Sequence, residues 1–132
     1  MNPNTLILMR GLPYSGKTTW ALRQGHPIVC PDAIRLALGH RFRAENEPLV
    51  WGIAKTMVLS LFLAGHTTVI VDATNTTQKR VDEWQSDSWR VEIQEIFTDK
   101  EECIARAKRA GDERILPVIE RMASQFEVEC DV

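Results

Sequence analysis

The sequence predicts an α/β fold in which helices flank a mostly parallel sheet of about four strands. Short apolar runs rich in β-branched residues alternate with segments of helical periodicity, as they do in parallel sheets. A glycine-rich turn joins the first apolar run to the first helical segment. The chain has 132 residues, 44% of them hydrophobic, which suffices for one core without disulfides or metal. We therefore expect a single domain over residues 1–132.

The individual elements follow from these patterns. Strands are predicted at residues 5–9, 27–30, 67–72 and 90–97. Helices are predicted at residues 17–24, 31–40, 45–64, 77–85, 100–111 and 116–127. The last strand alternates like one covered on a single face, whereas the other three are apolar runs typical of buried strands. The last two helices, separated by a charged break, predict a C-terminal helical lid.

Composition narrows the class of protein. The longest apolar run, residues 57–64, is too short to span a membrane, and the first ten residues lack the pattern of a signal peptide. The three cysteines have no C-x-x-C spacing, which favours reduced thiols. We therefore expect an untargeted cytoplasmic protein with no membrane partner.

Charge is unevenly distributed along the chain. Residues 1–43 contain six Lys or Arg and one acid, whereas residues 44–132 contain ten basic and seventeen acidic residues. An anionic ligand for the first third would explain this asymmetry, although solvated surface charge would produce it as well.

The stretch GLPYSGKT is a full match to the phosphate-binding pattern G-x-x-x-x-G-K-[ST]. Its glycines let backbone N–H groups turn toward phosphate oxygens, and the following helix adds its unpaired N–H groups. Lys17 would reach the β and γ phosphates, and the Thr18 hydroxyl would ligate Mg²⁺. The sequence thus predicts ATP and Mg²⁺ as ligands. The residues expected to bind the nucleotide here are Gly11, Tyr14, Ser15, Gly16, Lys17, Thr18 and Thr19.

Two carboxylates end predicted strands. Asp32 follows the second strand and Asp72 closes the third, so a parallel sheet would bring both to the edge that carries the phosphate loop. Asp32 could instead be a helix N-cap, and Asp72 a turn residue with Asn75. Arg35 lies one helical turn after Asp32, so the two side chains share a face and could form an acceptor site. As the alternative, Arg35 is a surface arginine.

Four motifs, GLPYSGKTT, PDAIR, VDATNTTQKR and R-x-x-R followed by LPVIERM, occur in this order between about residues 5 and 127. In this combination the chain resembles the P-loop kinases of the polynucleotide kinase type and the small bacterial and phage kinases grouped with them. The resemblance implies that Asp32 is the general base for a 5'-hydroxyl and that Arg35 contacts the acceptor phosphate. It places Asp72 in the acceptor site, beside Thr74 and Asn75.

The resemblance also implies a late arginine, on a lid helix, that contacts the donor phosphates. Family members space two lid arginines four residues apart, whereas here Arg106 and Arg109 are three apart and Arg114 follows. We expect Arg109 to be the catalytic one and Arg106 and Arg114 to bind the nucleotide, with the three as alternatives for one role.

Three functions are compatible with these patterns. The first is ATP-dependent transfer of the γ-phosphoryl group to the 5'-hydroxyl of a nucleic acid end. The second is phosphorylation of a small-molecule hydroxyl on a sugar, nucleoside or antibiotic. The third is a nucleotide-binding switch or ATPase module that acts through a partner. A switch should tolerate Asp32→Asn, whereas a kinase should not.

Overall fold

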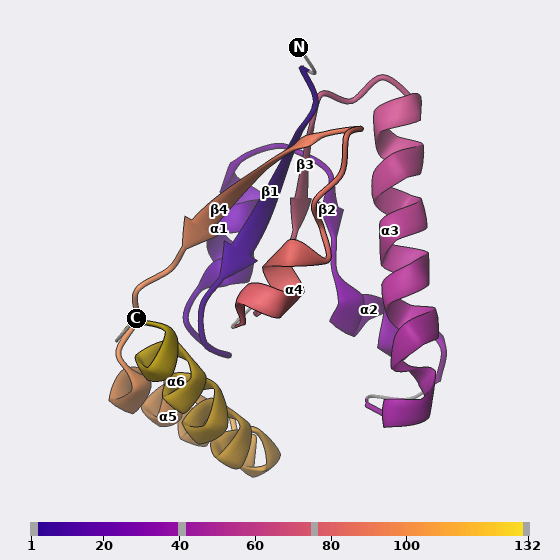
Figure 1. Cartoon of the computed structure of the whole chain (residues 1–132). Helices are drawn as coiled ribbons and strands as arrows, with labels where there is room; N and C mark the ends of the chain where they lie inside the picture. The colour runs from indigo at the N-terminus through magenta and orange to yellow at the C-terminus, as the bar shows by residue number, and fades with distance from the viewer. Residues whose placement is uncertain (1–2, 40–41, 75–76, 131–132) are drawn as a thin grey trace.

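The computed structural model describes residues 3–39, 42–74 and 77–130. Four parallel strands form one sheet in the order β2-β3-β1-β4. Their bounds are β1 (Thr5–Arg10), β2 (Ile28–Val29), β3 (Thr68–Val71) and β4 (Arg90–Glu95). All four strands end at the same edge of the sheet, which is the lower edge in Figure 1.

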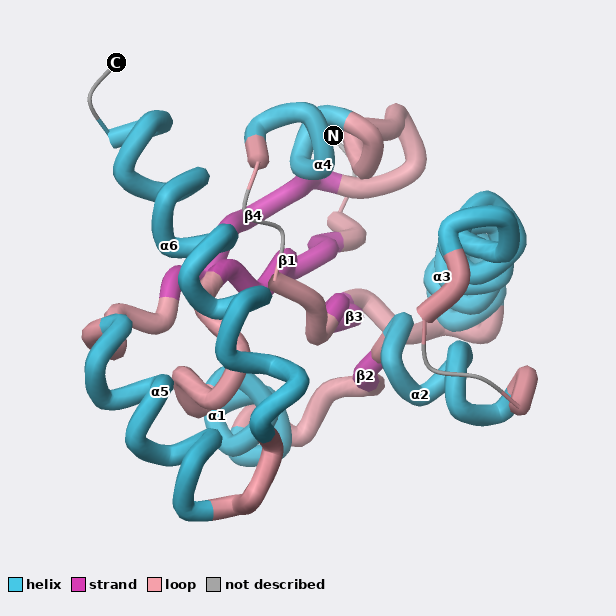
Figure 2. Tube along the Cα trace, turned by 90° about the horizontal axis from the view of Figure 1, so that it is seen from below, coloured by secondary structure: helices cyan, strands magenta, loops and turns pink. Residues whose placement is uncertain are grey.

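Helices cover both faces of the sheet (Figures 1 and 2). The α-helices are α1 (Lys17–Arg23), α2 (Pro31–Ala37), α3 (Glu47–Leu63), α4 (Gln78–Asp82), α5 (Lys100–Arg109) and α6 (Leu116–Cys130). Two short 3-10 turns, η1 (Ala44–Asn46) and η2 (Glu113–Ile115), precede α3 and α6. The α/β fold with a parallel four-stranded sheet and a C-terminal helix pair, as expected from the sequence, is confirmed.

Alternation along β1 divides the core between the two faces. Leu6 and Leu8 are fully buried in the cluster that α3 and α4 close, together with Val58 and Trp84. Met9 belongs to a second cluster with residues of α1, on the opposite face. Central strands of a parallel sheet are covered on both sides, which explains why β1 reads as a continuous apolar run.

β4 lies at the edge of the sheet and is only half covered, with exposed and partly buried residues mixed along it. The strict alternation expected from the sequence is not observed, because Ile93 is 43% exposed while Gln94 and Glu95 are partly buried. The helix expected at residues 45–64 is observed as α3, after the separate turn η1. No helix in the described part of the chain has the length and apolar character needed to cross a membrane.

The α5–α6 pair forms a third apolar cluster, away from the two that cover the sheet. Its buried members are Leu12, Cys103, Ala107, Ile119 and Ala123. Leu12 belongs to the loop after β1, so the helix pair packs directly on the glycine-rich turn. Figure 2 shows the pair beside the ends of β4 and β1, with α2 and α3 on the other side of the molecule.

Candidate functional site

The glycine-rich loop between β1 and α1 has the backbone that the phosphate-binding pattern requires. Gly16 has φ 102°, in the left-handed region that favours glycine, and it caps the start of α1. A Cβ on Gly11 would lie 2.9 Å from Ser15 Oγ and 3.1 Å from the Ile96 carbonyl oxygen. A side chain at Gly11 would displace Ser15 or the Ile96 backbone, so the local geometry favours glycine at both positions of the motif.

Lys17 is buried at the start of α1 and folds back over the loop. Its Nζ donates a hydrogen bond of 2.7 Å to the carbonyl oxygen of Leu12. Burial lowers the pKa of Lys17, while the nearby Asp72 carboxylate opposes that shift. A buried cation at the centre of this loop has the position needed to meet a phosphate anion.

Thr18 and Asp72 meet across the loop. The Thr18 hydroxyl donates to Asp72 Oδ2 at 2.7 Å, although the two residues are 54 positions apart. Asp72 is buried at the end of β3, and its backbone N–H donates to the Val29 carbonyl. The expectation that strand ends bring this carboxylate to the phosphate loop is thus confirmed. Asn75, its expected turn partner, lies outside the described residues.

A residue outside the loop, Thr98, fixes the loop backbone at Ser15. Ser15 is buried, and its carbonyl oxygen accepts a hydrogen bond of 2.8 Å from Thr98, which follows β4. The Ser15 hydroxyl has no partner among the described residues. Thr19 lies exposed in the first turn of α1. The backbone of this loop is thus fixed while one buried hydroxyl is still available to a ligand.

Asp32 and Arg35 lie together on α2, as expected from their spacing. Helix α2 begins at Pro31 with Cys30 in the cap position, so Asp32 is not the N-cap and that alternative is wrong. The Asp32 side chain is 88% exposed and accepts a hydrogen bond of 2.5 Å from Arg35 Nη1. The Arg35 side chain is only 14% exposed, which also excludes the interpretation as a free surface arginine.

Glu47, at the start of α3, holds Arg35 from the other side. Arg35 Nε and Nη2 donate to the two carboxylate oxygens of Glu47 at 2.9 and 2.6 Å. These hydrogen bonds hold the pKa of Glu47 below its usual range. The Trp51 indole N–H also donates to Glu47, and the Arg80 guanidinium lies 3.8 Å above the Trp51 ring. A chain of contacts therefore runs from Asp32 to α4.

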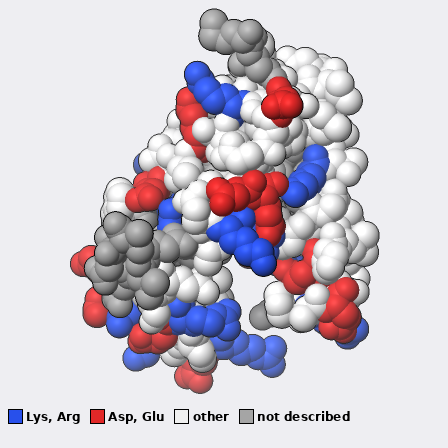
Figure 3. All heavy atoms as spheres, in the orientation of Figure 1, with Lys and Arg blue, Asp and Glu red and all other residues white. Residues whose placement is uncertain are grey.

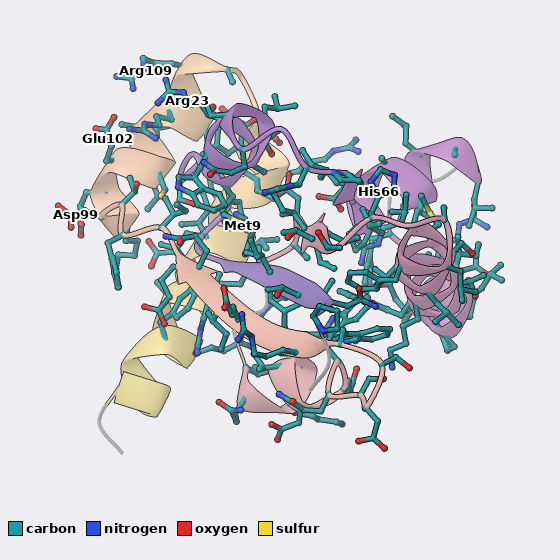
Figure 4. All side chains as sticks on the ribbon, turned by 90° about the horizontal axis from the view of Figure 1, so that it is seen from above. Met9, Arg23, His66, Asp99, Glu102 and Arg109 are labelled. Atoms are coloured by element: carbon teal, nitrogen blue, oxygen red, sulfur yellow. The ribbon has the colours of Figure 1, made fainter. Side chains whose placement is uncertain are left out.

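The three late arginines occupy different places. Arg106 Nη1 donates to the Tyr14 carbonyl at 3.1 Å, so this side chain lies on the phosphate loop. Arg109 is 68% exposed and pairs with Glu102, and both point away from the sheet on the outer side of α5 (Figure 4). Arg114 lies exposed in η2. The structure brings Arg106, and neither of the other two, to the loop.

The expected residues thus form two groups at one end of the molecule. The phosphate loop, Asp72 and Arg106 form the first, which we call the donor side. Asp32, Arg35 and Glu47 form the second, which we call the acceptor side. Figure 3 shows the surface hollowed between the α5–α6 pair and α2, at the end of the molecule where the strands end.

Sequence reasoning missed four residues that position this site: Thr98, Glu102, Asp112 and Glu47. All four act through contacts between separate elements or along a helix, and none belongs to a motif. Within the described residues, no three His, Cys, Asp or Glu side chains gather to hold a metal ion. Thr18 with Asp72 is a pair of hard oxygen groups of the kind that Mg²⁺ accepts beside substrate phosphates.

Fold and loop together define a P-loop domain of the kinase type, a nucleotide-binding fold. The family model described as an AAA domain matches residues 6–128, so the chain belongs to this family. A search of curated proteins found no match to the sequence.

Solved kinase structures share the fold. A chain in a structure of the Pnkp1/Rnl/Hen1 RNA repair complex matches with a TM-score of 0.85 at 20% identity, over 99% of this chain and 46% of that chain. A gluconokinase from Sinorhizobium meliloti 1021 matches with a TM-score of 0.62 at 14% identity, over 96% of this chain and 77% of that chain. Shikimate kinase from Acinetobacter baumannii in complex with shikimate matches with a TM-score of 0.57 at 20% identity, over 97% of this chain and 76% of that chain. The expected P-loop kinase fold is confirmed, and this chain spans less than half of the RNA repair chain.

Proposed function

We propose that residues 1–132 form a single kinase domain that transfers the γ-phosphoryl group of ATP to the 5'-hydroxyl of a nucleic acid end. The observation that carries this proposal is the exposed Asp32 carboxylate, which Arg35 holds at 2.5 Å while Glu47 holds Arg35. An exposed carboxylate in a fixed orientation, at the same edge as a phosphate loop, can accept a hydroxyl proton.

On the donor side, the buried Lys17 binds the β and γ phosphates, and backbone N–H groups of the loop and of the start of α1 surround them. Thr18 and Asp72 would hold Mg²⁺, which neutralises phosphate charge when bound. Arg106 lies on the loop and offsets the charge that develops on the transferred group. Arg109, expected from the sequence to take this part, lies farther out, so the geometry favours Arg106.

On the acceptor side, the hydroxyl oxygen attacks the γ phosphorus as Asp32 takes its proton. The bond between that phosphorus and the β–γ bridging oxygen breaks, and ADP leaves with the electron pair. Arg35 donates three of its five N–H groups to Asp32 and Glu47, which leaves two for an acceptor phosphate. The likeness to a chain of an RNA repair complex supports a nucleic acid acceptor.

A small-molecule acceptor is the second candidate, and one observation favours it. Two carboxylates already surround Arg35, so the acceptor side offers little net positive charge to a polyanion. The likeness to gluconokinase and shikimate kinase agrees with that alternative. Hydrolysis of ATP without any acceptor would instead support the ATPase or switch alternative.

Transfer of labelled γ-phosphate from ATP to 5'-hydroxyl DNA and RNA oligomers, nucleosides and sugars tests the proposal. We expect labelled oligomers, and an acceptor KM that rises steeply with salt because the acceptor is a polyanion. Lys17→Ala serves as the inactive control. Label on a sugar or nucleoside alone, with a KM insensitive to salt, would overturn the nucleic acid assignment in favour of the small-molecule one.

A further inference from the structure

Tyr14 occupies an unusual backbone position within the phosphate loop. Its φ is 65°, and it is the one non-glycine residue with positive φ in the described part of the chain. Glycine adopts this left-handed conformation without steric cost, whereas a tyrosine there must be held by its surroundings. The side chain of Tyr14 is therefore expected to make contacts that offset this cost.

Those contacts all lead to the α5–α6 pair. The Tyr14 hydroxyl donates to Asp112 Oδ2 at 2.9 Å, across 98 positions of the chain. Its ring packs against the apolar cluster that Cys103, Ala107 and Ile119 form between the two helices. The hydrogen bond to Asp112 raises the pKa of Tyr14.

Asp112 lies three residues beyond the end of α5, directly before η2. Its backbone N–H donates to the Ala107 carbonyl at 3.0 Å, and Ala107 is the neighbour of Arg106. Arg106 in turn donates to the carbonyl of Tyr14 itself. Tyr14 is thus held at two points: its hydroxyl bonds to Asp112, after the end of α5, and its carbonyl accepts from Arg106 within α5.

We propose that Tyr14, through its hydrogen bond to Asp112, is a positioning residue that fixes Arg106 over the phosphate loop. This inference rests on the proposed function, because it gives Arg106 a role toward the phosphates. The geometry makes the helix pair a support for the loop rather than a free flap. Movement of either part would break the Tyr14–Asp112 hydrogen bond and displace the Arg106 guanidinium.

The first test is kinetic and uses a double-mutant cycle. Tyr14→Phe keeps the ring and removes one hydrogen bond, so kcat should fall by about fivefold with little change in acceptor KM. In an Arg106→Ala background the same substitution should cause no further loss, because its effect passes through Arg106. Asp112→Ala should match Tyr14→Phe, whereas Asp112→Asn keeps an oxygen acceptor and should retain most activity.

An equal loss from Tyr14→Phe in both backgrounds, or no loss in either, would overturn the proposal. A drop in thermal stability with unchanged kcat would also overturn it, since that is what a purely structural hydrogen bond predicts.

The second test separates this inference from the kinase assignment. Amide hydrogen exchange of the free protein should speed up over residues 104–115 in Tyr14→Phe and stay unchanged over α3, with no nucleotide needed. If the wild-type chain transfers no phosphate but exchange rises as described, the proposed function fails while the contact between loop and helix pair stands. Unchanged exchange over residues 104–115 would refute that contact even in an active kinase.

Discussion

The donor and acceptor sides are built in different ways. On the donor side, eight consecutive residues contain most of the chemistry, and the glycine backbone determines where Lys17 and Thr18 go. On the acceptor side, the central contact joins Arg35 of α2 to Glu47 of α3, twelve positions later. A ligand site built from backbone therefore leaves a local motif in the sequence, whereas a side-chain network between helices leaves none.

The two sides also differ in exposure. Lys17 and Asp72 are buried, while the Asp32 carboxylate is almost fully exposed although its partner Arg35 is not. A buried cation can be strongly attracted to phosphate because little water screens it. An exposed carboxylate costs little to keep ionised and is accessible to an acceptor that enters from solvent. This division matches a tightly held donor and an exchangeable acceptor.

The largest expected effect is on the acceptor side. Asp32→Asn keeps the shape and removes the charge, so transfer should fall by about 100- to 10,000-fold, the range for loss of a general base. Thermal melting should barely change because the side chain is 88% exposed. Asp99→Asn, at the exposed N-cap position of α5, is the matched control (Figure 4). If Asp32→Asn had wild-type activity, the Asp32–Arg35 ion pair would have a structural role only.

The corresponding test of the donor side is Lys17→Ala. Loss of the buried ammonium should lower turnover by at least about 100-fold while the fold survives. Binding of ATP, measured by titration calorimetry, should weaken as well. Normal transfer by this variant would mean that the loop does not hold the donor phosphates.

Arg106 contacts the phosphate loop, whereas Arg109 lies on the outer side of α5. Arg106→Ala should lower kcat by about tenfold or more, because its guanidinium lies on the loop. Arg109→Ala should stay within about twofold of the wild type, since its charge lies on the outer side of α5. The two variants control each other because both arginines pair with Glu102. The reverse order of effects would restore the assignment expected from the sequence.

Sequence patterns predicted the fold well because burial on both faces of β1 and β3 requires continuous apolar runs. Such runs can be recognised from the local sequence alone. The second strand was predicted over residues 27–30 but contains only Ile28–Val29, the two residues that pair with β3, and α2 begins directly after Cys30. The helix expected over residues 77–85 ends at Asp82. Helix and strand ends depend on local caps and pairing, which periodicity does not record.

For the site, the approach of Asp72 to the phosphate loop was predictable because parallel strands bring their carboxyl ends to one edge of the sheet. The choice between Arg106 and Arg109 was not predictable. Basic residues lie at several positions around the end of α5, and only the burial of Cys103 and Ala107 decides which face packs on the loop. Glu47 was missed for a related reason: it meets Arg35 only because α2 and α3 pack together in the tertiary structure.

The smallest expected effect concerns Glu47, which joins the acceptor side to the core. Glu47→Gln keeps one oxygen acceptor and removes the charge, so the acceptor KM should rise by about three- to tenfold as Arg35 loses its fixed orientation. Unfolding free energy should fall by about 1–2 kcal/mol at neutral pH, because hydrogen bonds to a charged group are the stronger ones. Glu45→Gln, in the exposed turn η1, is the matched control.

The pH dependence of this variant follows from the lowered pKa of Glu47. A carboxyl whose pKa is lower in the folded than in the unfolded chain stabilises the fold above its ordinary value of about 4.3, and that stabilisation is lost as the pH falls through the lower, folded value. Arg35, Trp51 and Arg80 are the groups that face it. The difference in unfolding free energy between wild type and Glu47→Gln should therefore be largest at neutral pH and shrink below about pH 4.3. A difference that persists unchanged in acid would mean that Glu47 acts through shape, and that the acceptor side owes its geometry to packing rather than to charge.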